Sequence, residues 1–483
     1  MISMSLRPHI QVTKDDQSSL IVNFGKRRIA LTGIGSDLQE TLLLLADAPL
    51  VWDSQANGWS YGPRGIRRAL EESVIAQLVE RRIVQVTCSF GARDLMVAYP
   101  SGGPASFEFG TEAGDMHLRL SRFAYARNSG GVLMMELPHR FFRVRLLAAE
   151  VASLLVGLAY GDSVSGLCEH GPGSDKEFNG EVVRFLLGIG AIGLVSDKGE
   201  LDEDADADLA PREFHDVAFH GSSRLGLTDS AVGAEYPFLG RLEPAPAVKP
   251  TVLARSVSLP KPDLAAMVRD DPPLARVMEE RRSRRNYGAR DVTLEELGEF
   301  LYRTARVRSV TSAAPEAGFF YDTSSRPYPS GGAAYDLELY ITIGNCAGIP
   351  RGIYHYEPVE HALSLVNDDA VLIRATLDRA RRATGQERPP ILITYASRFN
   401  RLSWKYRAVS YATTLKNVGV LYEAMYLAGT AMGLAPCALG SGDSAIFSRV
   451  TGLSPLVESS VGEFSLGPCL QSREQAIEVT GSE

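Results

Sequence analysis

Lys405 and Tyr406 are the adjacent side chains of this chain with the clearest capacity to move protons. An amine can take a proton from carbon only when its pKa falls towards neutrality, and both burial and nearby cations lower the pKa of lysines. Three arginines, Arg398, Arg401 and Arg407, are close in sequence. Most Lys-Tyr pairs at the start of a helix are a solvated charge beside a packing ring, so a catalytic interpretation depends on the motifs around the pair.

The segment that follows the pair predicts a long core helix. Apolar residues recur at helical spacing from Val418 to Ala428, and Pro436 is expected to stop the helix. A Gly-Ser-Gly turn follows at residues 440–442. Most of this segment is therefore core, and it places the lysine and the tyrosine at its beginning.

An upstream loop has the composition of a rigid cradle for a flat ligand. Before the apolar strand that ends at Gly344, the chain has a turn of Pro, Ser and Gly. Gly331 and Gly332 lack the side chains that would block a close approach, and Pro327 and Pro329 fix φ before a ligand arrives. The alternative is an ordinary connection into a strand, which the loop by itself does not exclude.

A cluster of arginines is a candidate phosphate site. The sequence predicts a helix from Leu274 to Tyr287, and its last turn carries four arginines around one serine, Arg281, Arg282, Ser283, Arg284 and Arg285. Guanidinium groups are planar, permanently charged donors that match phosphate oxygens two at a time, and the serine hydroxyl adds a neutral donor. The alternative is a basic helix end that complements the helix dipole.

Together these segments resemble the SagB-type dehydrogenases, the flavin-dependent azoline oxidases of ribosomal peptide pathways, which include the cyanobactin oxidases. The resemblance rests on RRSRRNYG, RPYPSGGAAYDLELY, GIYHYEP with HALSLV, WKY and YLAGTAMGLAPCALGSGD, and it covers residues 251–468. A lead-in from Glu213 to Leu227 extends it upstream. The resemblance implies an α+β fold with a C-terminal nitroreductase-like flavoprotein domain.

The resemblance implies FMN as the cofactor and assigns nine residues to its site. Arg281, Arg282 and Ser283 would hold the phosphate, Arg285 would face the N1 and O2 edge of the ring, Pro329, Ser330 and Gly331 would lie along the isoalloxazine, and the backbone of Leu439 and Gly440 would lie near N5. A cation at the N1 and O2 edge stabilises the negative charge of reduced flavin. Many nitroreductases close the phosphate site with a basic pair near the C-terminus, whereas this chain has only Arg473 there.

Lys405 and Tyr406 correspond to the Lys-Tyr pair that the azoline dehydrogenases of the family use in catalysis. Oxidation of a thiazoline or oxazoline in a precursor peptide removes a ring-carbon proton and transfers a hydride to flavin N5. The resemblance therefore implies that Lys405 is the base and that Tyr406 donates to the ring heteroatom or relays a proton from it. No metal is implied.

The resemblance also implies a homodimer in which each subunit supplies part of the FMN pocket, with an azoline-containing precursor peptide as the partner. An NAD(P)H-dependent nitroreductase or flavin reductase of the same fold is the nearest alternative enzyme, and it would need neither Lys405 and Tyr406 nor the N-terminal units. A peptide-binding scaffold with a vestigial flavin domain is the alternative from another class. A yellow protein with an FMN-like spectrum would count against the scaffold.

The N-terminal half repeats one order of elements. Strands and two helices follow each other from Pro8 to Tyr99 and again from His117 to Val195, which suggests tandem winged-helix modules. Such units in ribosomal-peptide enzymes act as peptide clamps that pair a leader peptide against an exposed strand. A role in reading DNA is less favoured, because glutamates share the arginine-bearing helix of the first unit.

The chain is expected to have four parts. Acidic residues gather at positions 197–208, which predicts a solvated linker, and a Pro/Ala segment follows at residues 243–250. The parts are residues 1–105 as a first winged-helix, peptide-clamp-like unit, 106–210 as a second such unit, 211–250 as an acidic and Pro-rich lead-in, and 251–483 as the FMN-binding oxidase domain.

Composition excludes several other classes. A net charge of -8 over 483 residues argues against nucleic-acid binding, which needs a basic face. The five cysteines are scattered without a CxxC pair, which fits a reducing cytoplasm better than a disulfide framework or a zinc site. No apolar run reaches the roughly 18 to 20 residues that span a bilayer, so no membrane anchor is expected. The GxGxxG at residues 188–193 follows an apparent helix instead of a strand, so no dinucleotide site is predicted.

Overall fold

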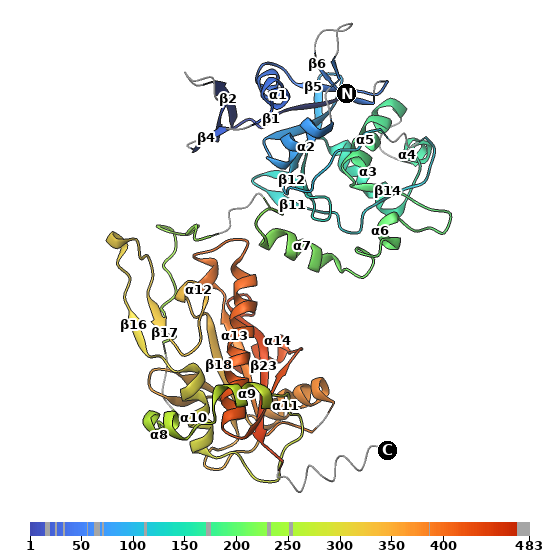
Figure 1. Ribbon diagram of the computed structural model, residues 1–483. Coiled ribbons are helices and arrows are strands. Elements are labelled where there is room, and N and C mark those ends of the chain that lie inside the picture. Colours follow the sequence, from blue (N-terminus) through green and yellow to red (C-terminus); the bar gives the residue numbers. More distant parts are fainter. Residues whose placement is uncertain are drawn as a thin grey trace. The chain divides into compact units, whose positions relative to one another are not determined.

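The computed structural model divides into two compact units, residues 1–231 and 232–483, shown blue to green and green to red in Figure 1. It describes residues 1–14, 20–24, 27–31, 34–55, 57–61, 68–69, 72–110, 114–170, 175–228, 233–250, 255–385 and 387–470. Arg473, the arginine that the sequence has near its C-terminus in place of a basic pair, lies outside these residues. The finer division into four parts stays a prediction.

The N-terminal unit is built on one antiparallel sheet of nine strands. In spatial order these are β11 (Tyr125–Ser129), β12 (Val132–Leu137), β13 (Phe142–Leu146), β9 (Arg93–Pro100), β8 (Val84–Phe90), β1 (Ile2–Leu6), β5 (Leu50–Asp53), β6 (Gly58–Tyr61) and β7 (Arg68–Ala69). Two smaller sheets contain β2 (Ile10–Lys14), β3 (Leu20–Phe24) and β4 (Arg27–Leu31), and β10 (Leu118–Leu120) with β14 (Ile192–Leu194). The winged-helix units are not confirmed, because strands of both predicted units join the large sheet where β9 pairs with β13.

Seven helices accompany these sheets. They are α1 (Ser36–Asp47), α2 (Glu72–Glu80), α3 (Ala149–Tyr160), α4 (Val164–His170), α5 (Lys176–Gly188), α6 (Asp202–Ala205) and α7 (Phe214–Ser223), among the described residues. The Asp175 carboxylate caps α5 by accepting from two backbone amides. The GxGxxG segment lies where α5 ends and leads into β14, so it is the helix exit that its sequence predicts.

The acidic run at residues 197–208 is exposed over most of its length, as its composition predicts, but part of it is ordered. Residues 202–205 form α6, and Glu203 and Asp204 bind other residues of the same unit. Glu203 accepts hydrogen bonds from Ser121 Oγ at 2.7 Å and from the Arg122 amide at 2.8 Å, and Asp204 pairs with Arg119 at 3.0 Å. Basic and hydroxyl partners distant in sequence therefore order a segment that would be mobile without them.

The C-terminal unit is built on an antiparallel sheet of seven strands. In spatial order these are β15 (Ser256–Ser258), β20 (Ala362–Asn367), β19 (Gly352–Glu357), β18 (Leu337–Ile343), β21 (Ile391–Arg398), β23 (Glu458–Pro468) and β22 (Leu434–Leu439). Every residue of β18, β19 and β21 is buried. These central strands are buried along their whole length because helices cover both faces of the sheet.

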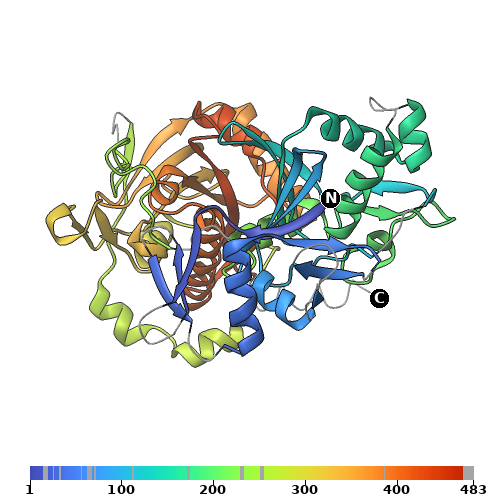
Figure 2. The ribbon, with the colours of Figure 1, turned by 90° about the horizontal axis from the view of Figure 1, so that it is seen from above.

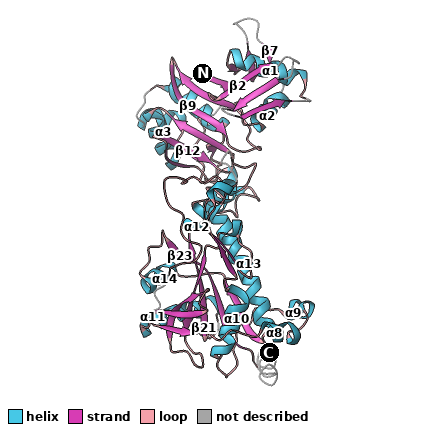
Figure 3. Cartoon of the chain, turned by 90° about the vertical axis from the view of Figure 1, so that its left-hand side faces the viewer, coloured by secondary structure: helices cyan, strands magenta, loops and turns pink. Residues whose placement is uncertain are grey.

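Figure 3 shows α11 and α14 on one face of the sheet, and α10 and α13 on the other. The helices of this unit are α8 (Leu264–Asp270), α9 (Leu274–Glu280), α10 (Leu294–Ala305), α11 (Ala370–Thr384), α12 (Asn400–Ser403), α13 (Ser410–Ala431) and α14 (Ser444–Thr451). A hairpin of β16 (Ser309–Thr311) and β17 (Thr323–Ser325) and two short turns, η1 (Pro315–Ala317) and η2 (Gly331–Ala333), complete it. The long α13 lies in the middle of the unit and is orange-red in Figure 2.

Two predicted helix ends are wrong. The arginine-bearing helix does not reach Tyr287, because α9 ends at Glu280 and the Arg284 amide donates to the Pro436 carbonyl at 3.0 Å instead of continuing the helix. Pro436 does not stop the core helix either: α13 ends at Ala431, and the proline lies within β22, an edge strand that can accommodate a residue without an N–H. Among the described residues, no helix is long and apolar enough to cross a membrane.

Candidate active site

Lys405 and Tyr406 lie in the turn between α12 and α13, next to the loop that contains Gly332. Lys405 Nζ donates a hydrogen bond to the Tyr321 hydroxyl at 2.7 Å, and that hydroxyl donates to the Gly332 carbonyl. A Cβ added at Gly332 would lie 2.5 Å from Lys405 Nζ and 2.6 Å from the Tyr406 hydroxyl oxygen. The candidate catalytic pair and the candidate flavin loop are therefore neighbours.

Hydrogen bonds from two core elements fix the loop. The Gly331 amide donates to Asn417 Oδ1 on α13 at 3.0 Å, and Asn417 Nδ2 donates to the buried Asp336 carboxylate at 2.7 Å. Ser330 Oγ accepts from the Tyr335 amide at 3.0 Å. Tyr335 has a φ of 45°, a region that residues with a Cβ rarely adopt. The loop therefore has a defined shape of its own, and Asn417, which carries no motif, is a site residue that the sequence did not reveal.

The arginine segment lies beside β22 and the C-terminal half of α13. Ser283 Oγ lies 2.7 Å from the Tyr426 hydroxyl oxygen, and the Arg281 guanidinium lies 5.3 Å from the centre of the Tyr426 ring. The Tyr426 hydroxyl also accepts from the Ala438 amide at 2.8 Å. Tyr426 thus ties the predicted phosphate segment to the strand that ends at Leu439.

The arginines of this segment suit an anion. None of Arg281, Arg282, Arg284 and Arg285 forms an ion pair with a residue that the structure describes, and Arg282 and Arg285 are exposed. Guanidinium groups without a carboxylate partner are available to a phosphate. With the glycine loop, they fit the two chemically different ends of FMN, a phosphate and a flat ring.

Within one chain, the glycine loop and the arginine segment do not lie on the same side of α13. Asn417, which binds the loop, and Tyr426, which binds Ser283, are nine residues apart on this helix (426 − 417). Nine residues correspond to about 14 Å of rise and two and a half turns, so the two side chains leave the helix on opposite sides. The loop and the arginines therefore belong to different faces of the unit.

The predicted N5 contacts lie at the end of β22, next to a buried carboxyl group. Leu439 pairs with Glu463 on β23, and the Leu439 carbonyl accepts from the Tyr422 hydroxyl at 3.5 Å. Gly440 directly follows the strand. Burial raises the pKa of Glu463 to about 7. No motif marks Glu463 in the sequence, and only the pairing of two distant strands places it here.

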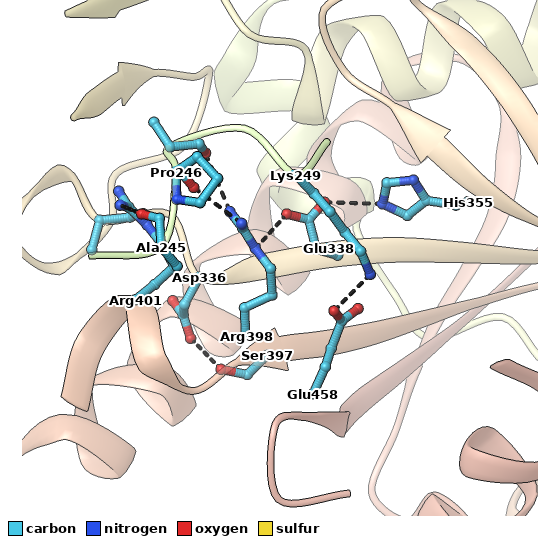
Figure 4. Close-up of polar contacts among 12 residues, drawn as sticks. Ala245, Pro246, Lys249, Asp336, Glu338, His355, Ser397, Arg398, Arg401 and Glu458 are labelled. Atoms are coloured by element: carbon cyan, nitrogen blue, oxygen red, sulfur yellow. Dashed lines mark hydrogen bonds and ion pairs between the residues drawn. The ribbon is translucent and has the colours of Figure 1, made fainter. Parts of the chain in front are cut away.

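A network of buried charges on β18, β19 and β21 lies close to the site (Figure 4). The Glu338 carboxylate lies 2.8 Å from Arg398 Nε and 3.0 Å from His355 Nε2, and His355 Nδ1 lies 2.8 Å from Glu357. Burial alone would raise the pKa of Glu338, but Arg398 and His355 outweigh it and lower that pKa to about 2. Burial alone would lower the pKa of His355, but hydrogen bonds with both glutamates raise it to about 9. The network is therefore charged at neutral pH.

Two of the three arginines close to Lys405 in sequence, Arg398 and Arg401, bind backbone carbonyls. Arg398 donates to the Pro246 carbonyl at 3.0 Å, and Arg401 donates to the carbonyls of Ala245 at 2.6 Å and Ala334 at 2.8 Å. They fasten residues 245–246 of the lead-in to the domain. Their described role is thus to assemble the walls of the site.

Two families match separate parts of the chain. Residues 278–467 match the nitroreductase family, and residues 118–229 match the family described as cyanobactin oxidase ThcOx. The MJ1384 protein of Methanocaldococcus jannaschii, named as a nitroreductase, is 29% identical over 168 residues, which are 34% of this chain and 77% of that protein.

Two proteins named for peptide processing are similar as well. The trifolitoxin-processing protein TfxB of Rhizobium leguminosarum bv. trifolii is 28% identical over 140 residues, which are 28% of this chain and 38% of TfxB. The microcin B17-processing protein McbC of Escherichia coli is 28% identical over 158 residues, which are 30% of this chain and 57% of McbC. The match thus spans less than two thirds of either protein. Together these findings support the predicted resemblance: one chain combines a nitroreductase-family match at residues 278–467 with a cyanobactin oxidase ThcOx match at residues 118–229, and it is similar to two proteins named for peptide processing.

Proposed function

We propose that this chain is an FMN-dependent dehydrogenase that oxidises thiazolines or oxazolines in a ribosomally made precursor peptide to the corresponding azoles. The observation that carries the proposal is the position of Lys405 and Tyr406 against Gly332, in the loop that would lie along a flavin. A nitroreductase that takes electrons from NAD(P)H has no need for an amine at that position. The similarity to McbC and TfxB, both named for processing peptides, supports a peptide substrate.

The proposed reaction divides its work among residues of this chain. FMN, when bound, would supply the acceptor for the hydride that leaves the azoline ring. Lys405 Nζ removes the proton from the neighbouring ring carbon, and the Tyr406 hydroxyl donates a hydrogen bond to the ring heteroatom or relays its proton. Arg281, Arg282 and Ser283 would hold the phosphate, and Arg285 would stabilise the negative charge of the reduced ring.

We also propose a homodimer with the FMN site between subunits. The loop and the arginines lie on opposite sides of α13, so a second copy would complete each site. Large apolar side chains are exposed on the three helices of this region, namely Leu264, Val268, Leu274, Met278, Tyr411, Leu415 and Val420. Exposed apolar side chains on α8, α9 and α13 would suit an interface with a second copy.

The decisive experiment mixes the yellow, full-length protein anaerobically with a peptide that contains one thiazoline. The flavin absorbance should decrease after mixing, and the peptide should lose the mass of two hydrogen atoms. The same peptide with a finished thiazole is the control and should leave the flavin oxidised. Bleaching by NADH or NADPH but not by the thiazoline peptide would establish the alternative reductase instead, and a protein without flavin would support a binding scaffold.

Arg281→Ala should weaken FMN binding. Loss of a charge-assisted hydrogen bond of about 1.5 to 3 kcal/mol raises the Kd for FMN roughly tenfold to a hundredfold. Binding is measured by titrating the apoprotein with FMN and with riboflavin, which lacks the phosphate. The variant should lose affinity for FMN alone. Arg276→Ala is the matched control, since that arginine is exposed on α9 and pairs with Glu280. Equal weakening for riboflavin would refute the phosphate assignment.

Gly332→Ala should abolish most of the activity while the fold survives. Gly332 has a φ of 62°, and the added methyl would meet the mobile ends of Lys405 and Tyr406, which would have to move aside. Displacing catalytic groups by about 1 Å can cost a hundredfold in rate. Gly318→Ala is the control, because it has a φ of 81° and open space around its Cβ. Both variants should lose about 1 kcal/mol of stability, and only Gly332→Ala should lose thiazoline oxidation. Equal activities would contradict the placement of the pair.

A further inference from the structure

Three tyrosines surround the amine of Lys405. Its Nζ lies 4.9 Å from the ring centre of Tyr321, 5.2 Å from that of Tyr406 and 6.0 Å from that of Tyr236. Only Tyr406 belongs to the motif that marks the site in the sequence. Tyr321 lies in the connection between β16 and β17, and Tyr236 comes from the lead-in, so parts of the chain that no motif includes hold the amine.

Hydrogen bonding gives Tyr321 a directional role. Its hydroxyl donates to the Gly332 carbonyl, so its only proton is engaged and its oxygen acts towards Lys405 as an acceptor. Lys405 must therefore donate an N–H to Tyr321. A neutral amine that donates here keeps its lone pair on the other side of nitrogen, free for a substrate proton. Burial raises the pKa of Tyr321, which keeps the hydroxyl protonated.

Residues of the lead-in also hold Lys405 in place. The amides of Glu235 and Tyr236 both donate to the Lys405 carbonyl, at 3.0 and 3.1 Å. The Tyr236 ring packs edge-on against Trp404, with the centres 5.7 Å apart. Tyr236 also has a φ of 49°, an uncommon conformation for a tyrosine that these contacts maintain. The backbone and the side chain of Lys405 are thus fixed by separate groups.

We propose that Tyr321 is a positioning residue for the base: it fixes the Lys405 amine against the Gly332 loop so that the lone pair faces the substrate, while Tyr236 closes the surrounding aromatic wall. This inference rests on the proposed function for its catalytic meaning. The hydrogen-bond chain from Lys405 to Tyr321 to Gly332 links the base to the flavin loop directly. A shift of either group is then transmitted to the other.

The kinetic test compares Tyr321→Phe with Tyr302→Phe on α10, outside the site. Both variants keep the ring and lose a hydroxyl, but among the described residues the Tyr302 hydroxyl makes no hydrogen bond. Tyr321→Phe should slow flavin reduction by the thiazoline peptide tenfold to a hundredfold with an unchanged KM and flavin content. The isotope effect from deuterium at the ring carbon should rise, because proton removal becomes more rate-limiting. Tyr302→Phe should stay within twofold of the wild type.

A second measurement is independent of activity. The full-length protein is treated with an amine-acetylating reagent, and the modification of Lys405 is followed by peptide mass mapping relative to Lys416, an exposed lysine on α13. Loss of the acceptor should make Lys405 react at least threefold faster in Tyr321→Phe and not in Tyr302→Phe. An unchanged ratio would overturn the positioning role. A raised ratio in a protein that does not oxidise thiazolines would uphold the contact and refute the proposed function.

Discussion

Lys405→Ala should keep its FMN and lose thiazoline oxidation by a factor of about 10² to 10⁴, the range that a general base contributes. The loss follows from geometry, because the amine is the basic group that faces the flavin loop next to Gly332. The rate is measured as flavin bleaching in a single anaerobic turnover, together with the loss of two hydrogens from the peptide. The flavin content should stay at the wild-type level, since the phosphate is assigned to Arg281, Arg282 and Ser283 and not to Lys405.

Two companion variants sharpen this result. Lys416→Ala removes an exposed lysine from α13 and should leave the rate unchanged. Tyr406→Phe keeps the ring and removes the hydroxyl that would assist at the heteroatom, so its loss should be smaller than that of Lys405→Ala. If Lys405→Ala oxidises the peptide at the wild-type rate, the base must be another group, and buried Glu463 beside Leu439 is the next titratable candidate.

Local sequence predicted the chemistry of this domain better than its boundaries. The motifs around Arg281 and Lys405 contain residues that act through their side chains, and Gly331 acts by having none. The residue types alone therefore indicate these sites. The end of α9 was missed because it depends on a backbone hydrogen bond between Arg284 and Pro436, which are far apart in sequence. Propensity extends a helix until tertiary contacts stop it.

The missing site residues have the same cause. Tyr321 is 84 positions from Lys405 and Asn417 is 86 positions from Gly331, and neither lies in a pattern that distinguishes it from an ordinary packing residue. The acidic run around Glu203 shows the converse error, since its composition predicts mobility while distant partners order it. These site residues and the order of the acidic run thus depend on contacts between remote segments, which periodicity and composition do not reveal.

A buried ion network on β18, β19 and β21 also holds the lead-in at Pro246. Glu338 lies on β18 between Arg398 and His355, and all three side chains are at least nine-tenths buried. Arg398 also holds the Pro246 carbonyl, so the ion network and the lead-in share one guanidinium. A charge that loses its partner in such a place has no water to replace it. Removing one member of the network should therefore destabilise the sheet that carries it.

His355→Gln should destabilise the C-terminal unit by about 3 to 5 kcal/mol, because it leaves Glu338 and Glu357 without the imidazolium between them. Urea unfolding followed by tryptophan fluorescence measures the change. Arg255→Ala is the control: it breaks an exposed ion pair with Asp368 and should cost less than about 1 kcal/mol. A loss as small as the control's would show that the network contributes no net stability.

The pKa shifts of His355 and Glu338 predict how the stability of the protein changes with pH. The folded-state pKa of His355, about 9, lies above its ordinary value of 6.5, so its contribution is complete below pH 6.5 and disappears as the pH rises through 9. The wild type should therefore lose stability between these values, and His355→Gln should lose less. The pKa of Glu338 is lowered to about 2 from 4.5, so its contribution is present above pH 4.5 and is lost as the pH falls towards 2. The loss of stability at low pH should persist in His355→Gln, because Arg398 still pairs with Glu338. If His355→Gln kept the full loss of stability between pH 6.5 and 9, a group other than His355 would cause that loss.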